Sequence, residues 1–348
     1  MEAFPTAPER VPDAAGRPCF GTYQGEVAQV RLDLLRPPEG VPAWLRPLRR
    51  KAWVYALVDT PEVILATAVV DLGYASNAFL TVVDLREKRA LVDFGAVGLP
   101  APFAAVNDRP ARGLHAHFRS PGAWLQLSRG ETSGPLRLKA ELAPFRTGGA
   151  GRLALALEVR TEGAPPPLTL VAPVPGGGIN VTTKSGGLLA SGSLDVGGRR
   201  VGLDGGVAGL DNTIGLPARR TSWRWAMGAG RLEDGRPVSF NLVEGFNEAE
   251  GANENAVWVG GALHPLGRAQ VGFGRDDPLG LWRLETLDGS LSLRFRPLHL
   301  HREERNLGLV QSRFWQLQGF FVGTVRAGEE LLRLSDLPGV TEDQDVLW

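Results

Sequence analysis

Strict alternation of side-chain type over several segments is the feature that most constrains how this chain can fold. Residues 136–142 place leucine or alanine at every second position between charged side chains, and residues 153–159 place leucine or valine at every second position. Successive side chains of a β-strand point to opposite sheet faces, so this period of two predicts strands with one buried face. No segment keeps a helical period for more than about three turns. The chain is therefore predicted to be all-β and antiparallel.

Turn-forming residues divide the chain into many short strands. The 45 glycines and 26 prolines are spread evenly, and turn signals separate β-rich segments roughly every ten residues. The clearest is Asp288-Gly289 between residues 281–287 and 290–296, because both central positions of a type I′ turn favour positive φ. At 348 residues, such a chain can form two domains or one very large β unit.

Three consecutive prolines, Pro165–Pro167, mark the best candidate for a domain boundary, because prolines cannot donate to a sheet and they stiffen a connection. We expect a proline-rich extended arm over residues 1–24. A β-barrel-like domain should follow over residues 25–165 and a second one over residues 166–348. The expected architecture is two antiparallel barrels or strongly bent β-sheets in tandem, with the functional site in the C-terminal unit.

Charge and composition narrow the classes of partner. The 38 basic and 38 acidic residues give no net charge, so no global field attracts nucleic acid or an anionic membrane. The one basic cluster, which comprises Arg46, Arg49, Arg50 and Lys51, is interpreted as a solvated strand entrance, with an anion contact as the alternative. Cys19 is the only cysteine, which excludes an intrachain disulfide and a cysteine-based metal site.

The location of the protein is expected to be cytoplasmic. Residues 1–16 lack the basic and apolar regions of a signal peptide. The longest apolar run, residues 63–70, is far shorter than the roughly 20 residues that a membrane helix needs, so no integral membrane segment is expected.

The sequence contains no established cofactor motif and only weak candidates for a metal site. The sequence has no nucleophile elbow, P-loop, zinc-protease motif or dinucleotide fingerprint, so no cofactor is expected. Two His-x-His pairs could each offer two imidazoles on one strand face. The alternation around His115 and His117 indicates an exposed face. His299 and His301 lie where a strand runs into a charged segment with Glu303; a metal there is the minor alternative, and no metal site is expected.

Residues 204–258 hold the densest set of unusual side chains. Thr221, Trp223 and Trp225 alternate along one predicted strand and therefore share a face, where the indoles could line a ligand cavity or fill a core. Around this strand lie polar residues that could serve the same site, namely Lys184, Asp211, Asn241, Glu244, Asn253, Glu254 and Asn255. A carboxylate facing an apolar cavity could act as an acid. Alternatively, these side chains satisfy turn and loop backbone groups.

These residues also carry a resemblance to a known family. The chain resembles domain-of-unknown-function family 2804 over nearly its whole length, through motifs in a characteristic order that include KAWVYALV at 51–58, TKSGG at 183–187, RTSWRWAMG at 220–228, NENAVW at 253–258 and LPGVTEDQDVLW at 337–348. The family has no established activity. Its layout is distantly similar to the lipocalin-like carotenoid 1,2-hydratases and tocopherol cyclases, which implies two lipocalin-like barrels. That likeness transfers no catalytic residue.

Together these patterns predict binding, with or without acid-catalysed conversion, of an apolar lipid- or isoprenoid-like molecule in a tryptophan-lined barrel cavity. Asp211 and Glu254 are the candidate acids. The candidate ligand-binding residues are Lys184, Trp223, Trp225, Asn241, Asn253 and Asn255. A non-catalytic lipid carrier and a carbohydrate-binding β-sandwich are the alternatives, and exposed indoles would favour the second.

Overall fold

The structure, a computed structural model, describes residues 4–36, 41–132, 134–176, 178–248, 252–306, 308 and 310–348. Within these ranges the protein is all-β, as the alternation predicted. Helical turns among the described residues are short: α1 (Arg46–Arg49) and the 3-10 turns η1 (Leu32–Leu34), η2 (Ala43–Leu45) and η3 (Pro144–Arg146). In this part of the chain, no helix has the length and apolar character required to span a membrane.

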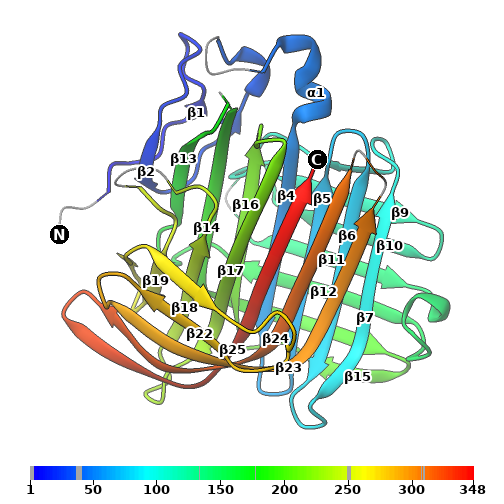
Figure 1. The fold of residues 1–348 in the computed structure, drawn as a ribbon. Coiled ribbons are helices and arrows are strands. Elements are labelled where there is room, and N and C mark those ends of the chain that lie inside the picture. The colour runs from blue at the N-terminus through cyan, green and yellow to red at the C-terminus, as the bar shows by residue number, and fades with distance from the viewer. Residues whose placement is uncertain are drawn as a thin grey trace.

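Eleven strands of the described chain form one antiparallel path that curls into a nearly closed barrel, in the order β7-β6-β5-β4-β16-β14-β12-β11-β10-β9-β8 (Figure 1). Their bounds are β4 (Lys51–Asp59), β5 (Val63–Asp71), β6 (Ser76–Asp84), β7 (Arg89–Gly98), β8 (Ala104–Val106), β9 (His115–Ser120), β10 (Ala123–Ser128), β11 (Leu136–Leu142), β12 (Leu153–Arg160), β14 (Gly178–Val196) and β16 (Gly206–Gly215). The strands β13 (Leu168–Val174) and β15 (Arg199–Gly202) pair with β14, and β2 (Gly21–Gln24) pairs with β13. The strands β1 (Arg10–Val11) and β3 (Gln29–Val30) form a separate parallel pair.

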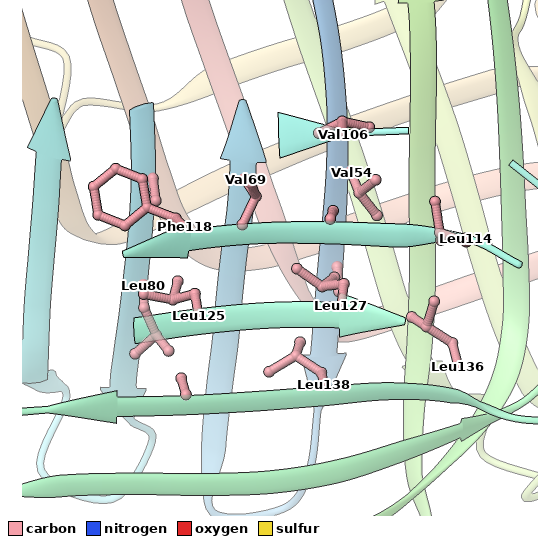
Figure 2. Close-up of a cluster of buried hydrophobic side chains, with 14 of the residues drawn as sticks. Val54, Val69, Leu80, Val106, Leu114, Phe118, Leu125, Leu127, Leu136 and Leu138 are labelled. Atoms are coloured by element: carbon pink, nitrogen blue, oxygen red, sulfur yellow. The ribbon is translucent and has the colours of Figure 1, made fainter. Parts of the chain in front are cut away.

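The core of this barrel forms where the curled sheet covers itself. Figure 2 shows β9, β10 and β11 running across β4, β5 and β6, with apolar side chains of both layers meeting between them. Leu125 and Leu127 of β10 face this core, and the intervening positions of β10 are partly exposed. The same alternation of buried and exposed positions continues along β11 and β12, so these strands have one buried face, as predicted.

The second sheet is a curled half-barrel with its own apolar core. Its nine strands, counted in the described part of the chain, follow the antiparallel order β20-β19-β18-β17-β25-β24-β23-β22-β21. Their bounds are β17 (Arg220–Arg231), β18 (Pro237–Glu244), β19 (Ala256–Val259), β20 (Ala262–Pro265), β21 (Ala269–Gly272), β22 (Trp282–Thr286), β23 (Leu291–Asn306), β24 (Gln311–Ala327) and β25 (Glu330–Leu347). Phe240, Trp282, Phe295 and Phe321 are fully buried in its core.

Strands β4 and β5 are apolar on both faces because they belong to two cores. Val54 and Ala56 of β4 face the barrel core, whereas Tyr55 and Leu57 on the opposite face join a third cluster with Trp225 and Val340 of the second sheet. This cluster forms where β17 and β25 pack against β4 and β16 (Figure 1). A strand that is covered on both sides has no polar face, which explains the continuous apolar runs.

The chain passes from the first sheet to the second between the end of β16 at Gly215 and the start of β17 at Arg220. On either side of the proline run, β12 and β13 both pair with β14, so the first sheet continues beyond residue 165. The proposed division at residue 165 stays a prediction about folding units. Within the proposed arm, β2 pairs with β13; residues 1–3 of that arm lie outside the described residues.

The interpretation of the basic cluster as a solvated strand entrance is wrong for two of its four members. Arg46 is 8% exposed, and its guanidinium donates to the carbonyl oxygens of Val41, Leu32 and Leu35. Lys51 is 1% exposed, and its Nζ donates to the carbonyl oxygens of Leu48 and Leu72. Backbone carbonyls solvate these cations in place of water.

Candidate functional site

A partly open cavity of about 460 Å³ lies between the two sheets. Strands β4, β5 and β6 supply one wall, and β17, β24 and β25 supply the other. Nine aromatic side chains of the described chain line it: Trp53, Tyr55, Tyr74, Phe79, Trp223, Trp225, Phe246, Phe314 and Trp348. The cavity is thus shared by both sheets, whereas the sequence placed the more probable site in the C-terminal half; that placement stays a prediction.

The alternation along β17 places Trp223 and Trp225 on this wall. The Trp223 ring stacks on Trp53 of β4, with centroids 6.1 Å apart and planes 15° apart. The edge of Trp225 meets Tyr55, with centroids 5.0 Å apart and planes 88° apart. Trp225 is 3% exposed, so it both packs in the inter-sheet cluster and lines the cavity. The two alternatives for this tryptophan pair, core and cavity wall, are compatible.

Three ionisable residues predicted for the site meet at the β14–β16 side of the cavity. Lys184 Nζ lies 2.8 Å from Asp211 Oδ2 and 3.4 Å from Glu254 Oε1, and all three side chains are buried. Burial alone would lower the pKa of Lys184, but the two carboxylates outweigh it and raise that pKa. Burial raises the pKa of Glu254, which the Lys184 cation only partly offsets. Asp211 also accepts a hydrogen bond from the Trp53 indole at 3.0 Å.

Glu342 of β25 is a fourth buried ionisable residue on the wall, and it was not predicted. Its Oε1 accepts a hydrogen bond from Trp223 Nε1 at 2.6 Å, and its Oε2 accepts one from Gln316 Nε2 at 3.1 Å. Burial raises the pKa of Glu342 to about 7, against the opposing effect of these two donors. The alternation of Val340, Glu342, Gln344 and Val346 was the available signal. It shows that the strand continues and that Glu342 shares a face with apolar residues.

Three asparagines predicted for the site lie behind the wall and do not line the cavity. Asn241 accepts a hydrogen bond from Trp225 Nε1 at 2.7 Å and donates to the carbonyl oxygen of Glu254 at 2.8 Å. Asn255 accepts from the backbone of Val243, and Asn253 accepts from the backbone of Asn255. Asn253 and Asn255 therefore satisfy backbone groups, as the alternative interpretation proposed, while Asn241 fixes the orientation of Trp225.

The second histidine pair, His299 and His301, belongs to a further polar cluster where β7 packs against β23. His299 Nε2 lies 2.7 Å from Asp93 Oδ2, and His301 Nδ1 lies 2.5 Å from Asp93 Oδ1. Burial would lower the pKa of His301, but Asp93 and Glu303 reverse this and raise it to about 9. Among the residues that the structure describes, no three histidine, cysteine or acidic side chains group as metal ligands would.

The fold and this site define a class of protein. It is an all-β protein in which a nearly closed barrel and a curled half-barrel hold a partly open, aromatic cavity with buried ionisable side chains between them. The chain belongs to the family described as domain of unknown function DUF2804, whose model matches residues 4–348. This confirms the resemblance seen in the sequence. A comparison with curated proteins finds no match.

A comparison with solved structures finds similar chains at low sequence identity. A structure of CghA with Sch210972 is similar with a TM-score of 0.51 and 14% identity, over 98% of this chain and 97% of that one. A putative AttH from Nitrosomonas europaea gives a TM-score of 0.48 and 15% identity, over 84% and 92% of the two chains. Kievitone hydratase from Nectria haematococca gives 0.43 and 11%, over 86% and 88%. At these identities, the likeness to CghA concerns the fold alone.

Proposed function

We propose that this protein binds a small, largely apolar molecule of the lipid or isoprenoid kind in the inter-sheet cavity and converts it by acid catalysis. The observation that carries the proposal is that Glu254 and Glu342, two buried carboxyls with raised pKa values, open onto an aromatic cavity. A volume of about 460 Å³ lies within the range of small-molecule sites. The CghA structure, which has a related fold, was solved with a small molecule, Sch210972.

The proposed chemistry begins with a protonated carboxyl beside a carbon–carbon double bond. Glu342 or Glu254 transfers its proton to one alkene carbon, the π electrons form the new C–H bond, and the neighbouring carbon becomes cationic. The π faces of Trp53, Trp223 and Trp225 stabilise that cation. Loss of a proton from the next carbon to a carboxylate then forms a shifted double bond. Asp211 is the weakest candidate acid, because its carboxylate is already engaged by Lys184 Nζ at 2.8 Å and by the Trp53 indole at 3.0 Å.

The alternatives differ in what they require of the tryptophans. A carbohydrate module needs indoles on an open face, and the 3% exposure of Trp225 argues against it. A lipid carrier would use the same cavity without turnover, so only a search for product separates it from the proposed enzyme.

The test is mass spectrometry of molecules extracted from the purified native protein, before and after incubation of that extract with fresh protein. We expect an apolar species at near-stoichiometric amount and a product of equal mass that Glu342→Gln forms more slowly. Trp225→Ala should reduce the bound amount. Absence of any bound apolar species would overturn the proposal, and a bound species that stays unchanged would favour the carrier.

A further inference from the structure

The charged side chains that line the cavity leave Glu342 without an ion-pair partner. In the described part of the chain, four carboxyl groups and two cations line it, namely Asp211, Glu254, Glu303, Glu342, Lys184 and Arg305. Lys184 lies within ion-pair distance of the first two, and His301 of the third. Glu342 has no such partner among the described residues, and its hydrogen bonds come from the neutral side chains of Trp223 and Gln316. An ionised Glu342 is therefore a buried anion that no cation balances, which is a costly arrangement.

Charges further away do not compensate this carboxyl. Burial has the largest effect on the pKa of Glu342, and of its two charged neighbours Asp211 raises that pKa more than Lys184 lowers it. Tyr55 of β4 also faces Glu342, and burial raises the pKa of its hydroxyl, which therefore stays neutral. Lys184 is moreover held by Asp211 and Glu254. An ionised Glu342 therefore attracts a positive charge from the cavity.

The tryptophans of the cavity present π surface to a ligand, and no free N–H group. Each tryptophan that lines the cavity in the described chain donates its indole N–H to a protein side chain; the pairs are Trp53 with Asp211, Trp223 with Glu342, Trp225 with Asn241 and Trp348 with Thr221. The negative face of an indole ring attracts cations. These four residues can therefore recognise a ligand by its hydrocarbon surface or by a positive charge.

Two of the four rings already have a cation over them, and two do not. Lysine nitrogens lie 5.8 Å from the centroid of Trp225 and 5.7 Å from that of Trp348. Within the described residues, no cation of the protein lies over Trp53 or Trp223. These two rings stack on each other, and Trp223 is the donor to Glu342. The π surface that no protein cation covers thus adjoins the carboxyl that no protein cation balances.

We propose that the inter-sheet cavity binds a hydrophobic ammonium ion, either quaternary or a protonated tertiary amine, whose nitrogen lies beside Glu342 and the rings of Trp53 and Trp223. Its hydrocarbon groups contact the remaining apolar wall. The inference rests on the proposed function, because the ligand occupies the same cavity. It also deepens that function, since an ammonium ion has the charge of the cation that forms when the acid protonates an alkene. A site that stabilises the one should bind the other tightly, so such amines should compete with the substrate.

Other charged ligands fit this wall less well. A ligand carboxylate would face Glu342, and the nearest cation, Lys184, is already shared by two carboxyls. A metal ion needs several oxygen, nitrogen or sulfur ligands, and the described residues contain no group of three histidine, cysteine or acidic side chains that could hold one. An ammonium ion with alkyl groups needs no such coordination, because its charge is spread over a hydrocarbon surface that aromatic rings can contact.

Quenching of the cavity tryptophans at pH 8 measures binding of three saturated probes of similar length. They are octyltrimethylammonium, its neutral isostere with a tert-butyl group in place of trimethylammonium, and nonanoate. Saturated chains contain no alkene to protonate, so binding is measured without turnover. We expect the preference for octyltrimethylammonium over the isostere to fall about tenfold in Glu342→Gln, because the buried anion is lost. Glu285→Gln, at an exposed position of β22, should leave this preference unchanged.

The outcomes separate the inference from the proposed function. If no probe binds, the proposed function fails. If octyltrimethylammonium and the isostere bind and Glu342→Gln leaves the ratio of their affinities unchanged, the ammonium assignment fails while the cavity function stands. Tightest binding of nonanoate would also overturn the assignment, in favour of an anion held by Lys184.

If Glu342→Gln does not fold, ¹³C NMR of wild-type protein labelled at its glutamate carboxyl carbons decides. The pKa of Glu342 is about 7, and octyltrimethylammonium should lower the midpoint of that carboxyl signal by about one pH unit, which corresponds to a tenfold preference for the ionised form. The isostere should not lower it. Burial also lowers the pKa of Lys51 to about 7, but a lysine contributes no carboxyl signal. An unchanged midpoint would overturn the assignment.

Discussion

The Trp223 indole N–H donates a 2.6 Å hydrogen bond to Glu342, although Glu342 lies directly opposite Trp225 in the β17–β25 register. The carboxyl therefore reaches diagonally between the two strands and lies against the cavity wall. A donor of this kind favours the charged carboxylate, yet burial has the larger effect and keeps the pKa of Glu342 near 7. The residue can thus exist in both protonation states near neutral pH.

Replacement of Glu342 by glutamine should make the protein relatively more stable as the pH rises. The pKa of Glu342 is about 7 in the folded protein, above its ordinary value of 4.5, so its contribution to stability is lost between about pH 4.5 and pH 7. Glutamine keeps an acceptor for Trp223 and has no such loss. Urea unfolding at pH 5 and pH 8 should show Glu342→Gln gaining on wild type by up to about 3 kcal/mol. A difference in the free energy of unfolding that is the same at pH 5 and pH 8 would contradict a raised pKa for the buried Glu342 carboxyl.

Replacement of His301 by glutamine should also gain on wild type as the pH rises, but over a higher pH range. The pKa of His301 is raised from 6.5 to about 9, so its stabilising effect is complete below about pH 6.5 and is lost through pH 9. The destabilisation of His301→Gln relative to wild type should therefore shrink between pH 7 and pH 9. The comparison with wild type matters, because burial lowers the pKa of Lys51 to about 7 and acts oppositely on the same range. A loss that is independent of pH would indicate packing alone.

Lys184→Met tests the buried charges at the other side of the cavity. The variant leaves Asp211 and Glu254 without their shared cation, which typically costs about 3–5 kcal/mol. The loss should be smaller at pH 5 than at pH 8, because burial raises the pKa of Glu254 and a protonated Glu254 needs no cation. Lys139→Met, on an exposed face of β11, should change the free energy of unfolding by about 0.5 kcal/mol or less. Equal effects of the two substitutions would show that Lys184 does not stabilise the buried carboxylates of Asp211 and Glu254.

Gly95→Ala tests the close approach of β7 to β23. The new methyl group would overlap Glu303 Oε1, so the variant should lose about 1–3 kcal/mol of stability. Gly202→Ala in β15 is the matched control, since a Cβ there meets nothing within 4 Å. Chemical denaturation of both variants measures the free energy of unfolding and checks this prediction. Similar losses of stability for the two variants would mean that β7 and β23 can move apart at Gly95 at little energetic cost.

Much of the fold could be predicted from local pattern, whereas the site could be predicted only in part. Alternation identified β11 and β12 because it depends only on neighbouring residues and one buried face. It also placed Trp223 and Trp225 together. The approach of Trp53 to Trp223 depends on how two sheets dock, and no local pattern encodes that. The alternation around Glu342 indicated only that it shares a strand face with apolar residues, and its partners Trp223 and Gln316 come from other strands.

The asparagines show a second limit of sequence analysis. A buried asparagine that binds a ligand and one that binds a backbone group have the same composition and spacing. Asn253 and Asn255 follow the local hydrogen-bonding tendency of their residue type, whereas Asn241 lies between Trp225 and the backbone of Glu254. Only the hydrogen-bond partners seen in the structure distinguish an asparagine that supports a cavity side chain from one that satisfies the backbone.

The two covered faces of β4 also affect how ligand preference could change. Val54 and Ala56 pack in the barrel core, and Trp53 and Tyr55, on the reverse side of the same strand, line the cavity. Packed interiors transmit displacement, so enlarging a barrel-facing side chain shifts the backbone that carries the cavity aromatics. Substrate range in such a protein can therefore be retuned by substitutions that never touch the substrate, and directed evolution should recover some of its specificity mutations inside the barrel.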